Sequence, residues 1–241
     1  MPKLRFSAHN LTIAGDVRDM PAYSIAVAAH YLQIPATTLR SWTCGRSYRL
    51  KDRSQKRFKP LIELPDKHSV LLSFRSLAEA HVLSALRREH AISMPHIRSA
   101  LNYVSKECGW KRPLIEQQFR TDGVGLFIER YGRLIDASAD GQQVMRQVVE
   151  AHLERLEWEN MSVARLYPFT RARDLNSPRS IVIDPRYSFG RPVLAKSHIS
   201  TEVIFDRYSA GESHDELAED YGCEKLDIEE AIRCESRRQA A

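Results

Sequence analysis

Near the N-terminus, apolar residues recur at helical spacing in two short runs that one tight break separates. The first run contains Ile25, Ala28, Ala29 and Leu32. Ser24 precedes it, and serine commonly caps the first turn of a helix. The second run contains Leu39 and Trp42, one turn apart, and it follows a break that ends at Pro35. Two short helices in immediate succession predict a helix-turn-helix, the arrangement that places its second helix in the DNA major groove.

The outward face of the second helix is suited to reading bases. With the two apolar residues turned inward, four polar residues point outward. They are Thr37, Thr38, Arg40 and Ser41. Because hydroxyl and guanidinium groups can bond base edges in the major groove, we expect base contacts from Thr37, Thr38 and Arg40. Trp42 would be the apolar anchor that fixes this helix to the core.

Charge is strongly segregated along the chain. Residues 40–59 contain eight Lys or Arg against one acid, whereas residues 212–230 contain nine Asp or Glu against one Lys. Such segregation predicts that the two ends contact different partners, and for the basic segment we expect DNA phosphates. The candidate phosphate contacts are Arg40, Arg46, Tyr48, Arg49 and Lys51. The alternative is a solvated basic loop beside a small helical core.

Beyond the basic segment, the sequence predicts a hairpin and two longer helices. Two apolar strings, 61–64 and 70–74, flank a stretch rich in turn-forming residues, which predicts a hairpin. A hairpin that follows a helix-turn-helix would be the wing of a winged helix. Helical spacing then recurs over 77–86 and over 97–104.

Together these segments resemble a known DNA-binding domain. The MerR-type winged-helix domain is similar over about residues 21–108, in YSIAVAAHYLQIPATTLRSW and, after the basic wing, in LSFRSLAEAHVLSALRREHAISMPHIRSALNYV. The Leu-Arg pair of that family's second helix corresponds to Leu39 and Arg40. Ser41 and Trp42 stand where the family usually has two tyrosines near the DNA backbone, so the chain departs from the family there. Ser41 is kept among the candidate DNA contacts by its position on the outward face of the helix.

The middle of the chain gives weaker patterns. Residues 114–136 alternate loosely between apolar and polar, which predicts two or three antiparallel strands. An amphipathic helix is expected next, on the spacing of Val144, Val148, His152 and Leu156. We interpret this region as structural or dimerising, and His152 as a packed helix residue.

The C-terminal part is expected to begin after a linker. Residues 168–180 are polar, with prolines near both ends and no apolar period. A strand over 180–183 and two turn signals follow. Helical spacing then predicts a helix over 201–208, another around Leu217 and a third around Ile228. Gly222 should end the second of these, and the three helices again have the outline of a helix-turn-helix.

Residues 179–235 resemble the family known as domain of unknown function 433. The matching residues are Ile183, Asp184, Pro185, Gly190, Arg191, Pro192, Gly211, Glu212, Leu217 and Tyr221. Members of that family are linked to toxin–antitoxin operons of the VapBC kind, in which the partner is a PIN-like ribonuclease. The family's usual Gly-Thr-Arg is replaced here by residues 196–198, so no role of that motif is carried over. A MerR-like front joined to this module resembles the mycobacterial VapB-type antitoxins.

The charge of the C-terminal module favours a protein partner over DNA. Its third helix would present acids that repel phosphate, namely Glu224, Asp227, Glu229 and Glu230. A solvated acidic face is the alternative. PIN-like nucleases gather carboxylates around Mg²⁺, and arginines can pair with such carboxylates. The candidate toxin contacts are therefore the arginines of the tail, Arg233, Arg237 and Arg238.

Other features of the sequence narrow the class of function. No apolar run reaches membrane length and no signal sequence is recognised, so we expect a cytoplasmic protein with no membrane partner. The four cysteines lack CxxC spacing and are expected to be reduced thiols. We find no phosphate-binding loop, nucleophile elbow or HExxH motif, and the histidines show no metal-ligand spacing. We therefore expect no enzymatic activity, no metal and no cofactor.

These patterns predict a mainly α protein with small β elements (α+β). We expect a MerR-like winged-helix DNA-binding domain over 1–110, a middle hairpin-plus-helix segment over 111–167, and a linker with a helix-turn-helix-like antitoxin module over 168–241. The predicted function is that of a homodimeric antitoxin that neutralises a PIN-like ribonuclease toxin by direct binding and represses its own operon by binding operator DNA. The alternative is a MerR-like regulator that answers a small molecule and has no toxin, which a ligand pocket in the middle region would favour.

Overall fold

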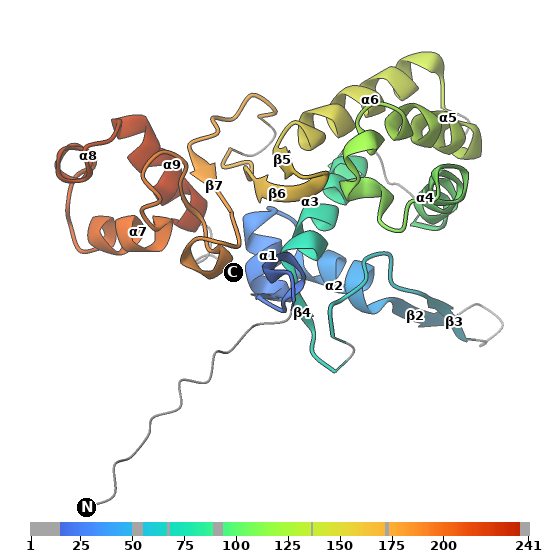
Figure 1. Cartoon of the computed structure of the whole chain (residues 1–241), viewed down its shortest axis with the longest axis horizontal. Coiled ribbons are helices and arrows are strands. Elements are labelled where there is room, and N and C mark those ends of the chain that lie inside the picture. Colours follow the sequence, from blue (N-terminus) through green and yellow to red (C-terminus); the bar gives the residue numbers. More distant parts are fainter. Residues whose placement is uncertain are drawn as a thin grey trace, which may run out of the picture.

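A computed structural model describes residues 15–49, 55–66, 68–88, 94–135, 137–171 and 174–236. Helices dominate this part of the chain, and each of its small sheets is one antiparallel strand pair, so the expected α+β class is confirmed. Figure 1 shows a central unit with a projecting hairpin, a group of helices above the hairpin, and a C-terminal module at the opposite end. Among the predicted contact residues, Lys51, Arg237 and Arg238 lie outside the described residues.

The central unit contains the two short helices expected from the sequence. Its elements are β1 (Tyr23–Ser24), α1 (Ile25–Tyr31) and α2 (Ala36–Cys44). The Ser24 hydroxyl caps α1 and accepts a hydrogen bond from the Val27 N–H at 3.3 Å. Leu39 and Trp42 are buried, as the spacing predicts. We call α2 the reader helix.

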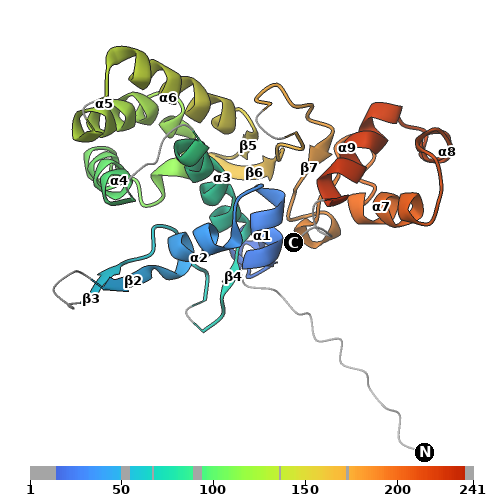
Figure 2. The ribbon, with the colours of Figure 1, turned by 180° about the vertical axis from the view of Figure 1, so that it is seen from behind.

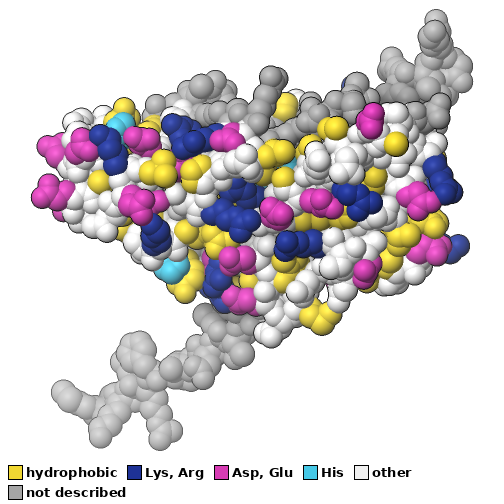
Figure 3. Space-filling view, turned by 90° about the horizontal axis from the view of Figure 1, so that it is seen from above, with side chains coloured by type: hydrophobic (Ala, Val, Ile, Leu, Met, Phe, Trp, Pro, Cys, Tyr) yellow, Lys and Arg dark blue, Asp and Glu magenta, His cyan; other side chains and the backbone are white. Residues whose placement is uncertain are grey.

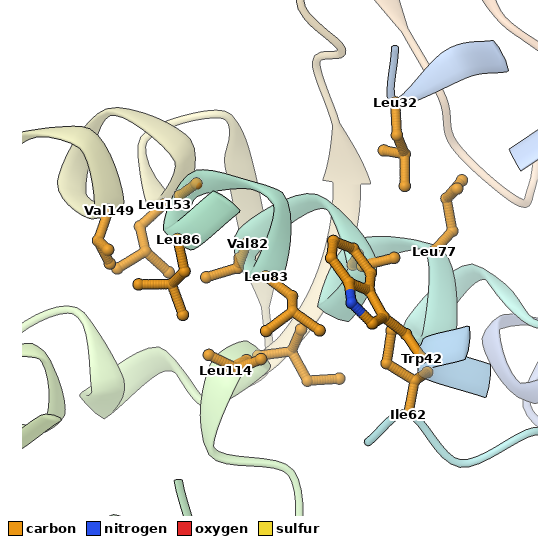
Figure 4. Packing of buried hydrophobic residues seen from close by; sticks show 14 of the residues in the cluster. Leu32, Trp42, Ile62, Leu77, Val82, Leu83, Leu86, Leu114, Val149 and Leu153 are labelled. Atoms are coloured by element: carbon orange, nitrogen blue, oxygen red, sulfur yellow. The ribbon is translucent and has the colours of Figure 1, made fainter. Parts of the chain in front are cut away.

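Trp42 anchors the reader helix. Its indole lies in the main apolar cluster, close to Ile62 and to Leu77 of α3 (Phe74–Arg88), as Figure 4 shows. Its backbone carbonyl accepts hydrogen bonds from the N–H groups of Leu61 at 2.7 Å and Ile62 at 3.0 Å. Carbonyls in the last turn of a helix lack a partner within that helix. Here the chain that returns from the hairpin supplies the partners, so it is tied to the end of α2.

The wing is formed by a different segment from the one expected. β2 (Arg46–Arg49) pairs with β3 (Gln55–Phe58), so the basic segment itself forms the hairpin. The hairpin predicted over 61–64 and 70–74 is wrong, because β4 (Leu71–Leu72) pairs with β1 instead. Because β1 and β4 are far apart in the sequence, no local pattern of residues could have predicted their pairing. We call the β2–β3 pair the basic hairpin.

Gly45 connects the reader helix to the basic hairpin, and no larger residue fits there. Its φ is +77°, in the left-handed region that favours glycine. A Cβ at this position would lie 2.3 Å from the carbonyl oxygen of Phe58. The close approach of the two backbones fixes where the hairpin leaves the helix.

α3 runs through the centre of the molecule, as the view from behind shows (Figure 2). Most of its residues are buried. α6 (Ala139–Leu153) packs against it, and α4 (Met94–Cys108) packs against α5 (Gly123–Ile135). The helices predicted over 77–86 and 97–104 are confirmed as α3 and α4. One apolar cluster extends from β1 through α3 to residues 166 and 183, so the central unit and the middle of the chain share a core.

The strands predicted over 114–136 are wrong. Two short 3-10 turns, Pro113–Ile115 and Gln117–Phe119, lead into the helix α5. The buried residues of α5 keep helical spacing and include Val124, Phe127, Ile128 and Tyr131. Gly132 lies inside the helix at a tight crossing, where a Cβ would meet the Gln142 side chain of α6 at 2.6 Å.

The helix expected after this segment is confirmed as α6, with a shorter range than the spacing predicts. Val148 and His152 are buried, and the centroids of the His152 and Phe169 rings lie 4.9 Å apart. Val144 is exposed. Leu156 lies beyond the helix in β5 (Leu156–Glu159), which pairs with β6 (Ser162–Leu166).

The C-terminal module matches its expected helices. Its elements are β7 (Ile181–Val182), β8 (Val193–Leu194), α7 (Thr201–Ser209), α8 (His214–Tyr221) and α9 (Lys225–Ser236). A second apolar cluster includes Ile204, Leu217 and Ile228, one residue from each helix. α8 begins with a capping box between Ser213 and Glu216, and it ends at Gly222 with φ +59°, as predicted.

The module is attached to the rest of the protein along a packed seam. Leu166 and Ile183 form an antiparallel bridge, and the Tyr23 hydroxyl donates to the Gly190 carbonyl at 2.9 Å. The side-chain amide of Gln33 donates to the carbonyl of Phe169, which is buried. The segment between the two parts therefore packs against the α1–α2 turn.

Asp184 is the ionic centre of this seam. It is buried and accepts hydrogen bonds from Arg165 Nε at 3.1 Å, Arg186 Nη2 at 2.7 Å and the Arg186 backbone N–H at 2.9 Å. Burial opposes ionisation, but these donors outweigh it and hold the pKa of Asp184 below its ordinary value of 3.8.

Replacing Trp42 by alanine should lower the free energy of unfolding by about 3–5 kcal/mol, because it removes a buried aromatic side chain. Urea unfolding followed by circular dichroism measures this change. Thr37→Ala, on the exposed face of the same helix, is the matched control and should change stability by less than about 0.5 kcal/mol. Equal stability of Trp42→Ala and the wild type would contradict the packing.

Asp184→Asn should lower the free energy of unfolding by about 1–2 kcal/mol at neutral pH, because it removes the charge that two guanidinium groups bind. The folded pKa lies below the unfolded one, so this stabilisation is present above the unfolded pKa and is lost as pH falls through the folded value. The gap between variant and wild type should therefore shrink below about pH 4. Urea unfolding across this pH range measures the gap, and a constant gap would refute the role of the charge.

Candidate nucleic-acid interface

The reader helix turns its polar residues away from the core, as predicted. Thr37 and Arg40 are exposed, and Thr38 and Ser41 are half-buried. The Ser41 hydroxyl donates to the Thr38 carbonyl at 2.7 Å, so its proton is used within the helix and only its oxygen remains to accept a bond. Thr37, Thr38 and Arg40 therefore lie on the outer side of α2, as a base-reading surface would require. Ser41 has no free hydroxyl proton to donate to DNA.

The basic hairpin projects from the end of the reader helix, away from the rest of the molecule (Figure 1). Arg46, at the start of β2, is exposed. Tyr48 and Arg49 continue the same strand and pair with Lys56 and Gln55 of β3. Four of the predicted phosphate contacts, from the reader helix to Arg49, therefore lie on one continuous helix-and-hairpin unit.

Two exposed arginines of this unit, Arg40 and Arg46, have no acidic partner among the described residues. Other arginines do have one: Arg75 pairs with Asp16 at 2.7 Å and Arg112 with Glu79 at 2.8 Å. Exposed cations without such a partner are available to a polyanion such as the DNA backbone.

Arg98 of α4 fixes the root of the hairpin, a role that the sequence patterns did not reveal. Its guanidinium donates to the Pro60 carbonyl at 3.0 Å and to the Lys59 carbonyl. Partial burial lowers the pKa of Arg98. Neither Arg98 nor Gly45 could be found from spacing, because their roles depend on backbone groups brought close only by the fold. Lys59 was visible in the charge run and is exposed at the same root.

The C-terminal acids are less available than the sequence predicts. Of the four acids assigned to the face of the third helix, Asp227 and Glu230 are buried, which corrects that expectation. Glu230 is fully buried because it accepts hydrogen bonds from Thr170, Arg171 and Arg233. Arg233, a predicted toxin contact, is thus engaged within the protein.

The acidic surface of the module lies mainly on α8. Its exposed acids are Asp215, Glu216, Glu219 and Asp220. In the view from above, acidic side chains gather toward the end of the molecule that the C-terminal module occupies (Figure 3). Because this surface repels phosphate, the reader helix and basic hairpin are the part of the described structure best suited to DNA.

Other kinds of site have little support among the described residues. No group of three or more His, Cys, Asp or Glu is placed to hold a metal ion there, and no helix there is long and apolar enough to cross a membrane. A cleft of about 610 Å³ lies between α5 and α6, lined by residues that include Glu129, Gln142 and Arg146. This wide and largely polar cleft is the feature of the middle region that the small-molecule alternative would use.

Two family models match separate parts of the chain. Residues 21–101 match a family described as "Putative DNA-binding HTH domain". Residues 181–233 match a family described as "Protein of unknown function (DUF433)". The first match agrees with the predicted DNA-binding helix-turn-helix and covers the reader helix, the basic hairpin and α3. The second agrees with the resemblance of the C-terminal module to domain of unknown function 433.

The chain is also similar to proteins of Mycobacterium tuberculosis. A relative named "Putative antitoxin VapB45", from strain ATCC 25618 / H37Rv, is 29% identical over 229 residues, which cover 89% of this chain and 93% of the relative. The X-ray crystal structure of Rv2018 from the same species superposes with a TM-score of 0.62 at 23% identity, covering 88% of this chain and 98% of that one. The relative confirms the resemblance to VapB antitoxins, and the crystal structure supports the fold.

Proposed function

We propose that this chain is an antitoxin of a type II toxin–antitoxin system that represses its own operon by binding operator DNA. The observation that carries the DNA-binding role is a pair of exposed arginines on a helix-and-hairpin unit, Arg40 and Arg46, which have no acidic partner among the described residues. A helix-turn-helix family model matches this same part of the chain. The antitoxin role is supported by similarity to a relative that bears that name.

In the proposed complex the reader helix enters the major groove. Thr37, Thr38 and Arg40 face the base edges, and the proposed phosphate contacts are Arg40, Arg46, Tyr48, Arg49 and Lys51. Gly45 and Arg98 keep the hairpin in a fixed position relative to the helix, so these contacts are pre-organised. We also propose a homodimer, because helix-turn-helix proteins commonly read two half-sites with two copies of the reader helix.

Arg40→Ala combined with Arg46→Ala should weaken binding to every duplex, because phosphate contacts carry little sequence information. The slope of log affinity against log salt concentration should fall by about 2, since each phosphate contact contributes about 0.9. Fluorescence anisotropy between about 50 and 200 mM salt measures both effects, on the chain's own promoter region and on an unrelated duplex.

Arg133→Ala is the matched control for this experiment, because Arg133 is an exposed arginine of α5 that pairs with Glu129. It should bind both duplexes as the wild type does. If the double variant retained the wild-type affinity and salt slope, the reader helix and hairpin would not be the DNA-binding surface.

For the toxin we propose a PIN-like ribonuclease that binds the C-terminal part of the chain. Arg233, Arg237 and Arg238 would pair with the carboxylates that such a nuclease gathers around its metal ion. Arg233 would then have to exchange its bond with Glu230 for one with the toxin. The acidic α8 supports a protein partner at this end, because it disfavours nucleic acid.

Co-expression with the PIN-like protein of its own operon should give a stable complex in which the ribonuclease is inhibited. Changing Arg237 and Arg238 to alanine should weaken the complex, because two charge-assisted pairs are removed. Co-purification and an RNA-cleavage assay measure the two effects, with Arg133→Ala as the control. Failure of the wild-type chain to bind the nuclease would refute the toxin partner, whereas an unaffected double variant would refute only the role of the tail.

A further inference from the structure

Phe189 is the most exposed large apolar side chain in the described part of the protein. It lies between β7 and β8, and 95% of its surface is accessible to solvent. Its φ is +54°, and that of Ser188 is +46°, in the left-handed region that residues with a Cβ seldom adopt. An aromatic ring held in solvent on strained backbone is costly for folding alone, and such strain often persists where a contact requires it.

The loop that carries Phe189 is held firmly. The Gly190 carbonyl accepts the Tyr23 hydroxyl at 2.9 Å, and a Cβ on Gly190 would lie 2.2 Å from that hydroxyl oxygen. On the other side of Phe189, the Tyr187 ring stacks on His198 with centroids 4.1 Å apart. The ring is therefore presented at a fixed place, which lowers the entropy lost when a partner binds it.

A second exposed apolar residue lies beside this loop. The antiparallel bridge between Leu166 and Ile183 runs β6 alongside the start of the C-terminal module, which brings the β5–β6 turn toward Phe189. Arg186 confirms the approach, because it donates to both carboxylate oxygens of Glu159, at 2.8 and 3.1 Å. The tip of that turn is Met161, which is 60% exposed and has a φ of +62°.

Three exposed apolar residues therefore lie in one region of the surface. Met161, Tyr187 and Phe189 all belong to the ten large apolar residues that are exposed in the described part of the chain. We call this group of three the Phe189 patch. Clustering of this kind marks a binding surface rather than scattered exposure.

The charges around the Phe189 patch are balanced, which distinguishes it from the reader helix. Arg186 pairs with Asp184 and Glu159, and Arg191 pairs with Glu202 at 2.6 Å. Such a surface offers no net positive field to DNA. When the same surface meets itself across a twofold axis, no like charges are left unpaired, so a second copy of this chain is an occupant that fits its charge.

We propose that the Phe189 patch is the surface through which two copies of this chain associate about a twofold axis. Phe189 of each copy inserts among the apolar residues of the other patch, where aromatic side chains commonly supply most of the binding energy. This assignment depends on the homodimer proposed above. A dimer formed through the Phe189 patch leaves the reader helix and the basic hairpin of both copies free for DNA.

The test replaces the apolar side chains without disturbing their backbone. Phe189→Asn and Met161→Asn each place at a left-handed position the residue that, after glycine, best tolerates it. Each variant should therefore fold at least as stably as the wild type. The dissociation constant of its dimer should rise by about tenfold or more, as expected for loss of a central interface residue. Val203→Ala is the control, because Val203 is an exposed apolar residue on α7, outside the patch.

Sedimentation equilibrium of the purified full chain measures the dimer constant, and thermal unfolding measures stability. Support requires a wild-type dimer, weakened dimers in both asparagine variants, and an unchanged dimer in Val203→Ala. A monomeric wild type would overturn the homodimer itself, whereas a wild-type dimer that survives Phe189→Asn would overturn only this surface. Equal weakening by Val203→Ala would also reject the patch, because the effect would then not be specific to it.

Discussion

The presentation of the basic residues depends on how Trp42 is held. Its indole is buried against α3, which fixes the rotation of the reader helix about its own axis. Its carbonyl receives the N–H groups of Leu61 and Ile62, so the chain returning from the basic hairpin is bound to the same residue. One side chain and one carbonyl therefore determine which face of the helix is free and where the hairpin begins.

Some arginines of the protein form ion pairs with acids, whereas Arg40 and Arg46 of the reader unit do not among the described residues. Several arginines outside the reader unit, namely Arg75, Arg165 and Arg186, each pair with an acid within a few ångströms. Arg40 and Arg46 have no such partner in the described structure, while exposed acids collect on α8 at the opposite end. A molecule with this polarity attracts a polyanion to one end and turns its other end away from it, which orients the encounter as well as strengthening it.

The sequence predicted those elements whose formation depends on residues close together in the chain. The helices of the reader unit and of the C-terminal module were readable, because apolar spacing, the Ser24 cap and the Gly222 stop act within one or two turns. The strands expected over 114–136 are wrong because the buried residues of that segment follow helical spacing in α5, where Gly132 allows a close crossing with α6. The wing was misplaced because β4 pairs with a distant strand. For the site, the exposed face of α2 was predictable, whereas the bonds of Arg98 depend on the completed fold.

The contact between Tyr23 and Gly190 has a consequence for how proteins of this kind can change. The Tyr23 hydroxyl fills the space that any side chain at residue 190 would need, and it donates a hydrogen bond to the Gly190 carbonyl. The two halves are thus not freely exchangeable cassettes, since a front half taken from elsewhere would have to bring a tyrosine to the same place. Recombination between relatives should succeed only where both members of this pair travel together.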